Sequence, residues 1–199
     1  MNLTSTALLL VDLQNDFLHK DGGYARGGAT NPDTVALPEK LKPLCAAMRA
    51  KGCAIGATMF TLVPGRGGEP MISPHLQKLR PFLRKGDFMP GSWGQQVVDE
   101  LAPVDFAVEK IAYSAFYMTR LEWVLRKFGI EHLIVGGIVT NGGVASTVRD
   151  AHVREFECTV LEDGCAAPTP AMHAAAIEGL RPVASVRSIE AVLADLAVS

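Results

Sequence analysis

The sequence predicts an α/β protein with a three-layer, doubly wound and mostly parallel sheet of about six strands and with helices on both faces. Two observations carry this prediction. Short apolar runs alternate along the chain with segments whose apolar residues recur at helical spacing. The runs at 7–11 and 133–139 are continuously apolar, which is typical of strands buried on both faces of a parallel sheet.

The expected elements follow one another in a regular order. The run 7–11 is the first strand and ends at Asp12. Apolar residues recur at helical spacing within 36–51, and Gly52 ends that helix. The other expected strands are 53–59, 105–110, 132–138, 157–162 and 183–186, and the other expected helices after the middle of the chain are 143–155, 169–180 and 188–197.

One helix and one long irregular region complete this assignment. Thr119-Arg120-Leu121-Glu122 has the pattern of a capping box, and apolar residues follow on one face as far as Phe128, before Gly129 ends the helix. Residues 60–95 are rich in Gly and Pro, with a short helix expected only within 76–83. Long loops in a compact domain are usually functional. Because the chain has no repeats or linkers, we expect a single domain over 1–199.

Composition restricts the class of protein. The net charge of −2 and the isoelectric point near 6.2 argue against nucleic acid or an anionic membrane as a partner. The apolar runs are much shorter than the roughly 20 residues that span a bilayer. The first residues lack the positive segment of a signal peptide, so we expect a cytoplasmic protein. Its four cysteines show no metal-ligand spacing and are expected to be reduced and packed in the core.

Polar residues with useful chemistry follow three of the expected strands. Asp12 is followed by Leu-Gln-Asn-Asp-Phe, and Lys110 is followed by Ile-Ala-Tyr-Ser-Ala-Phe. The third segment is the turn Ile138-Val139-Thr140-Asn141-Gly142-Gly143. Since ligands bind at the carboxyl ends of the strands in open α/β sheets, these three segments are expected to converge.

The three segments together resemble the motifs of the isochorismatase-like hydrolase superfamily, which includes nicotinamidases, N-carbamoylsarcosine amidohydrolases and isochorismatases. The resemblance implies that Asp12 is a general base and acid and that Lys110 is its electrostatic partner. It also implies a cis peptide bond between Ile138 and Val139. The backbone N–H groups of Val139 and Gly143 would then form an oxyanion hole.

Two departures from the superfamily pattern matter for function. Most members carry a catalytic cysteine at the position of Gly143, where no thioester can form in this chain. Some isochorismatases also resemble this chain in having glycine there, and they rely on the aspartate to protonate an enol ether. The Asp-x-His pattern of metal-binding nicotinamidases is missing after the second strand, and His19 and His75 lack partners at metal spacing, so we expect no cofactor and no catalytic metal.

Other residues are candidates for the pocket or for catalysis. Phe17 and Trp93 are expected to line the substrate pocket, because the resemblance implies a site lined with aromatic residues. Tyr113 and Asn141, which belong to the second and third motifs, are expected to line it as well. Arg66, on a Gly-rich loop, either clamps a substrate carboxylate or is a surface residue. Cys165 could replace the missing nucleophile, but relatives that have the catalytic cysteine commonly carry a cysteine here too, which favours a structural role.

The sequence leaves several functional hypotheses open. The leading one is a thiol-independent hydrolase of a small molecule, such as the vinyl ether isochorismate. The first alternative is a catalytically inactive member that binds a small carboxylic acid or amide. Another is a Cys-to-Gly variant of an amidase of the nicotinamidase or N-carbamoylsarcosine amidohydrolase type, natural or engineered. Since relatives commonly assemble, a homodimer or homotetramer is expected.

Overall fold

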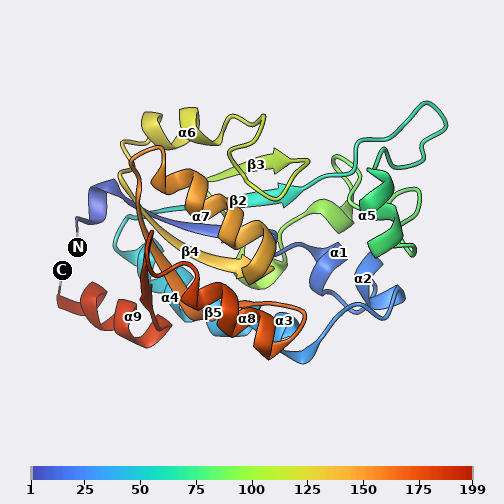
Figure 1. The fold of residues 1–199 in the computed structure, drawn as a ribbon. Coiled ribbons are helices and arrows are strands. Elements are labelled where there is room, and N and C mark those ends of the chain that lie inside the picture. The colour runs from blue at the N-terminus through green and yellow to red at the C-terminus, as the bar shows by residue number, and fades with distance from the viewer. Residues whose placement is uncertain (1, 199) are drawn as a thin grey trace.

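A six-stranded parallel sheet forms the centre of the computed structural model, which describes residues 2–198 (Figure 1). Every neighbouring pair of strands is parallel, and the order in the sheet is β3-β2-β1-β4-β5-β6. The predicted α/β fold class is therefore confirmed. The strands are β1 Thr6–Val11, β2 Ala54–Phe60, β3 Phe106–Lys110, β4 His132–Ile138, β5 Glu157–Ala166 and β6 Ser185–Arg187.

Helices cover both faces of this sheet, and short helices lie beyond the carboxyl ends of the strands (Figure 1). Side chains of β1 alternate between the two faces, as the pleat of a strand requires. Leu9 packs in one apolar cluster with α6 and α7, whereas Leu8 and Leu10 pack in the other with α4 and α9. The helices are α1 Asn15–Leu18, α2 Gly23–Arg26, α3 Pro32–Val35, α4 Leu37–Ala50, α5 Pro74–Leu79, α6 Leu121–Lys127, α7 Ala145–His152, α8 Pro170–Glu178 and α9 Ile189–Val198.

The strand order reverses direction between the adjacent strands β1 and β4. From β1 the chain moves outward through β2 to β3, and then it returns to β4 on the other side of β1. Adjacent strands whose connections leave in opposite directions open a crevice at their carboxyl ends. Asp12 follows β1 and Gly143 follows β4, so both lie at this switch point.

The start of α6 differs from the sequence prediction. In a capping box the Thr119 hydroxyl would accept a hydrogen bond from the third helical N–H group, and Glu122 would reach back. Here the hydroxyl accepts from the N–H of Leu121 at 3.1 Å, and the Glu122 carboxylate pairs with Arg154 at 3.1 Å. The Glu122 carboxylate therefore forms an ion pair with Arg154 and does not cap the start of its own helix. Gly129 does follow the helix in the left-handed conformation, with φ of +68°.

The boundaries around β4 and β5 also differ. Strand β5 continues to Ala166, beyond the expected end at 162, with an irregular register opposite Val135 and Gly137. The helix expected from 143 begins instead as one π-helical turn, Thr140–Val144, before α7 continues. No helix within residues 2–198 is long and apolar enough to cross a membrane.

The cysteines are all free and buried. Burial raises the pKa of Cys45 to about 11 and those of Cys158 and Cys165 to about 12, and it raises the pKa of Cys53 as well. Neutral thiols with pKa values this high are poor nucleophiles. This placement agrees with the structural role expected for Cys165.

Gly137 is expected to be the least replaceable glycine of the sheet. Its φ is +132°, and a Cβ atom there would lie 2.1 Å from the carbonyl oxygen of Val11, because β4 passes β1 so closely. We expect Gly137→Ala to lower the free energy of unfolding by more than roughly 3 kcal/mol. Gly129→Ala is the matched control, since it has a positive φ in open space and should cost about 1 kcal/mol. Urea titrations that give equal losses for the two variants would contradict this view of the β1–β4 contact.

Candidate active site

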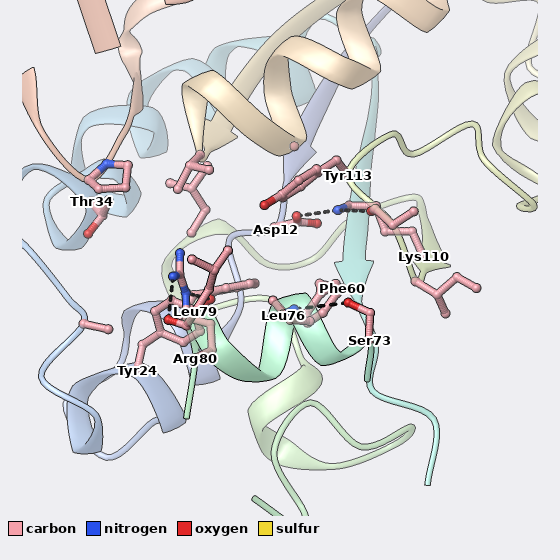
Figure 2. Close-up of a pocket in the computed structure, with 18 of the residues that line it drawn as sticks. Asp12, Tyr24, Thr34, Phe60, Ser73, Leu76, Leu79, Arg80, Lys110 and Tyr113 are labelled. Carbon is pink, nitrogen blue, oxygen red and sulfur yellow. Dashed lines mark hydrogen bonds and ion pairs between the residues drawn. The ribbon is translucent and has the colours of Figure 1, made fainter. Parts of the chain in front are cut away.

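A buried ion pair lies where β1 and β3 end. The Lys110 ammonium lies 2.6 Å from Oδ2 of Asp12, and the two side chains are 1% and 7% exposed. Lys110 also donates to the carbonyl oxygen of Ala112 at 3.0 Å, and Asp12 Oδ1 accepts from the Thr58 hydroxyl at 2.7 Å. The pair is thus fixed from three neighbouring strands of the sheet (Figure 2).

The backbone at Asp12 turns sharply as soon as the strand ends. Its φ of +57° lies in the left-handed region, which Asp tolerates better than most residues. Its N–H group still bonds to the carbonyl oxygen of Thr58 at 3.2 Å, so β2 holds the turn in place. The carboxylate is consequently aimed out of the sheet and toward the pocket described below.

Burial raises the pKa of Asp12 above its ordinary value, while Lys110 and the Thr58 hydroxyl oppose that rise. Desolvation disfavours the charged carboxylate, and a neighbouring cation favours it. Because desolvation is the larger effect, Asp12 holds a proton more readily than an exposed aspartate. A carboxyl group whose pKa is raised in this way is a stronger base and is more readily kept as an acid than an exposed aspartate, which suits proton transfer.

The residues after Asp12 fasten the surrounding loops. Gln14 is fully buried, donates to the carbonyl oxygens of Phe60 and Gln95, and accepts from the N–H of Phe60. Asn15 donates to the carbonyl oxygen of Trp93 at 2.9 Å. The next carboxylate, that of Asp16, accepts from the N–H groups of Gly23 and Phe88. The motif therefore supplies one buried acid, Asp12, to the cavity wall and a set of anchors behind it.

The turn after β4 brings Gly143 up to the ion pair. The peptide bond between Ile138 and Val139 is cis, the conformation that the resemblance implies. A Cβ atom on Gly143 would lie 3.2 Å from Oδ2 of Asp12 and 2.9 Å from the carbonyl oxygen of Ile138. Glycine at this position therefore lets the turn approach the Asp12 carboxylate closely, and both residues line the cavity described below. That the amides of Val139 and Gly143 form an oxyanion hole stays a prediction.

One cavity, with a volume of about 510 Å³, joins these groups. Its wall is mainly apolar and aromatic, and its polar groups come from the strand ends and from the 24–34 and 73–80 segments (Figure 2). Small-molecule sites typically have such walls with a few converging polar groups. The residues that carry the argument are Asp12, Lys110, Ile138, Val139 and Gly143, with Phe17, Tyr24, Phe60, Arg80 and Tyr113 around them.

The structure thus brings together most of the site residues expected from sequence, but not all of them. Trp93, Asn141 and Arg66 are not among the described residues that line the cavity. Trp93 is 47% exposed and its ring packs against that of His19, while its backbone carbonyl accepts the hydrogen bond from Asn15. Asn141 points to solvent from the π-helical turn, and Arg66 is exposed in its loop.

Several lining residues were missed because their segments carry no periodic pattern. Tyr24 lies on a four-residue helix, and Arg80 follows the short helix α5 within the irregular 60–95 region. Their only sequence signal is that a long loop in a compact domain tends to be functional. No group of three or more His, Cys, Asp or Glu side chains among residues 2–198 is placed to hold a metal ion.

Comparison with known proteins agrees with this geometry. A model of the isochorismatase domain family matches residues 6–191. The chain belongs to the isochorismatase family. Among its relatives are the ureidoacrylate amidohydrolases RutB of Cronobacter sakazakii and Pantoea ananatis, 36% and 34% identical over 169 residues. These matches cover 79% of this chain and 73% and 68% of the two relatives, and the family that this chain shares with them is one of hydrolases.

Solved structures of the family have the same fold. The cysteine hydrolase of Pseudomonas syringae pv. phaseolicola superposes with a TM-score of 0.84 at 24% identity, covering 100% of this chain and 95% of that one. The N-carbamoylsarcosine amidase of Thermoplasma acidophilum gives 0.72 at 25% identity, covering 93% and 96%. The isochorismatase fold therefore extends over the whole of the described chain.

Removing the ammonium should raise the pKa of Asp12 further in the Lys110→Met variant, because desolvation then acts unopposed. A carboxyl group whose pKa is higher in the folded chain binds more protons there than in the unfolded chain. The free energy of unfolding should therefore fall as pH rises from about 4 to the new pKa, by up to about 1.4 kcal/mol per pH unit. Urea titrations across this range measure that slope. The control Asp12→Asn/Lys110→Met should lose it, and an equal slope in both variants would disprove the pairing.

A cysteine at position 143 should react far faster than the native cysteines. Gly143→Cys places a thiol beside the Asp12–Lys110 pair at the start of a helical segment, where Asp12 can take the thiol proton and the paired ammonium favours the thiolate. The Cβ atom needs a shift of a few tenths of an ångström from the Ile138 carbonyl. We expect iodoacetamide to label this variant at least about 10-fold faster than Asn141→Cys, an exposed control in the same turn. Labelling at the wild-type rate would show that residue 143 does not face the pair.

Proposed function

We propose that this protein hydrolyses a small molecule without a covalent enzyme intermediate, with Asp12 moving the proton and Lys110 as its electrostatic partner. The observation that carries the proposal is the buried 2.6 Å pair of Asp12 and Lys110 beside the side-chain-free Gly143. Since no side-chain nucleophile can come from position 143, water itself attacks the substrate. Asp12 is the titratable acid that lines the cavity beside Gly143.

Two reactions of this kind fit the geometry. In a vinyl ether, the carboxylic acid of Asp12 protonates the vinyl carbon, water adds to the resulting cation, and the adduct breaks down to an alcohol and a carbonyl compound. In an amide or ureide, Asp12 takes a proton from the attacking water and passes it to the leaving nitrogen. In both reactions one water is consumed, and Asp12 ends in the protonation state in which it began.

The first reaction is the leading proposal. Burial raises the pKa of Asp12, which favours the acid form that a vinyl ether requires as its proton donor. Isochorismate is the vinyl ether to be tested first. The relatives named ureidoacrylate amidohydrolases favour the second reaction, with a ureide such as ureidoacrylate as substrate.

A binding protein without turnover is the second candidate function. The observation in its favour is the glycine at position 143, where the resemblance implies that most of the family carries its catalytic side chain. Such a protein would keep the cavity and hold a small carboxylic acid or amide in it. A rise in melting temperature with ligand, without product, would support this candidate.

We expect turnover of isochorismate, with ureidoacrylate and nicotinamide as the competing substrates in the same assay. Asp12→Asn should lower kcat by at least about 10²-fold, because a positioned acid is lost. Lys110→Met should cause a loss of similar size, and the double variant should be little slower than either, since residues that act as a unit are not additive. Glu109→Gln is the control, because this exposed neighbour of Lys110 does not line the cavity and should keep full activity.

Three outcomes would decide against the mechanism. Turnover that survives Asp12→Asn would remove the proton donor from the proposal. Additive losses in the double variant would show that Asp12 and Lys110 do not act together. Ligand-dependent stabilisation without product for every compound would favour the binding protein instead.

A further inference from the structure

The cavity contains a second cation, Arg80, that the proposed proton transfer does not use. Arg80 follows α5 and lines the same cavity as Asp12 and Lys110. Its Nε donates to the Tyr24 hydroxyl at 3.0 Å, and one terminal nitrogen donates to the carbonyl oxygen of Leu79 at 3.0 Å. Figure 2 shows this side chain extended beside Tyr24 and apart from the ion pair.

Arg80 differs from Lys110 in having no acidic partner. Among the described residues, no carboxylate lies within 4.0 Å of its guanidinium, whereas Lys110 pairs with Asp12 and the nearby Arg26 pairs with Asp87. A guanidinium has five N–H donors, and the two hydrogen bonds above leave several unused. A positive charge with free donors therefore faces a largely apolar cavity.

The surroundings hold this guanidinium in a fixed position. The Tyr24 ring packs edge-on against Phe17 at 4.6 Å and against Phe82 at 5.2 Å between ring centroids. Just after Arg80, the chain is fastened by the 2.5 Å ion pair of Asp87 with Arg26. Since Phe17 belongs to the motif that follows Asp12, the cation and the acid are positioned from one connected set of contacts.

We propose that Arg80 determines specificity by binding a carboxylate of the substrate, while the bond to be hydrolysed lies at Asp12. This inference rests on the proposed function and names its substrate class, a small organic acid whose reacting group is separated from its carboxylate. It gives Arg80 the role that the sequence suggested for Arg66. Tyr24 is the positioning residue, because it orients the guanidinium and does not itself need to touch the ligand.

Arg80 would select a carboxylate over the matching neutral amide because the two groups form different hydrogen bonds with a guanidinium. A carboxylate accepts two charge-assisted hydrogen bonds from a guanidinium, which a carboxamide of the same shape does not. A site built for the acid leaves its buried donors unsatisfied when the amide binds. Affinity should therefore favour the acid of a matched pair by at least about 10-fold.

The test measures binding and needs no turnover. Calorimetric titrations compare benzoate with benzamide, and 3-ureidopropionate with 3-ureidopropionamide, on the wild type and on Arg80→Gln, Arg80→Lys and Tyr24→Phe. We expect Arg80→Gln to lose the preference for the acids, Arg80→Lys to keep part of it, and Tyr24→Phe to weaken it. Arg84→Gln is the matched control, because Arg84 is exposed nearby and does not line the cavity, and it should behave as wild type.

The outcomes separate this inference from the proposed function. Equal affinity for acid and amide in the wild type, an unchanged preference in Arg80→Gln, or no binding of either acid at millimolar concentration would overturn the inference. Melting curves of each variant show that a lost preference is not a folding defect, and Arg80→Lys keeps the charge if Arg80→Gln does not fold. A preference that depends on Arg80 without turnover of any substrate would overturn the proposed function alone.

Discussion

The site depends on the burial of one ion pair. Two charges removed from water are tolerated only when their geometry and remaining hydrogen bonds are good, and removal of one partner leaves an uncompensated charge. Asp12 and Lys110 satisfy this condition through their direct contact, the Thr58 hydroxyl and the carbonyl oxygen of Ala112. The groups come from the ends of neighbouring parallel strands, so the register of the sheet is what keeps the pair together.

The loops around the pair are held from the same strand end. Gln14, Asn15 and Asp16 have short polar side chains that saturate backbone groups of the segments near 60, 88 and 95. Buried backbone groups without partners are costly, so these amide and carboxylate side chains allow irregular loops to pack closely over the sheet. The loops that form the cavity wall have no regular sequence pattern, but the side chains that hold them in place all belong to the one motif that follows Asp12.

Site residues could be predicted from the sequence where they lie at the ends of regular strands. Apolar runs located the strands, and their carboxyl ends then placed Asp12, Lys110 and Gly143 near one another before the structure was known. The cavity wall could not be predicted in the same way, because Tyr24 and Arg80 lie in segments whose conformation is set by tertiary contacts. Trp93 shows the same limit, since its aromatic character suggested a cavity wall, whereas in the structure its ring lies half exposed against His19.

The charges of the cavity also link recognition to proton transfer. With Asp12 ionised, the site contains one anion and two cations, Lys110 and Arg80, and protonation of Asp12 removes the only negative charge among these three. An anionic ligand at Arg80 supplies a replacement and repels the Asp12 carboxylate. Burial is the main reason that the pKa of Tyr24 is raised, and the charge of Asp12 adds to that rise, so Asp12 is electrostatically coupled to the Arg80 end of the cavity. In the proposed reaction, a carboxylate bound at Arg80 would therefore favour the protonated form of Asp12 that hydrolysis of a vinyl ether requires.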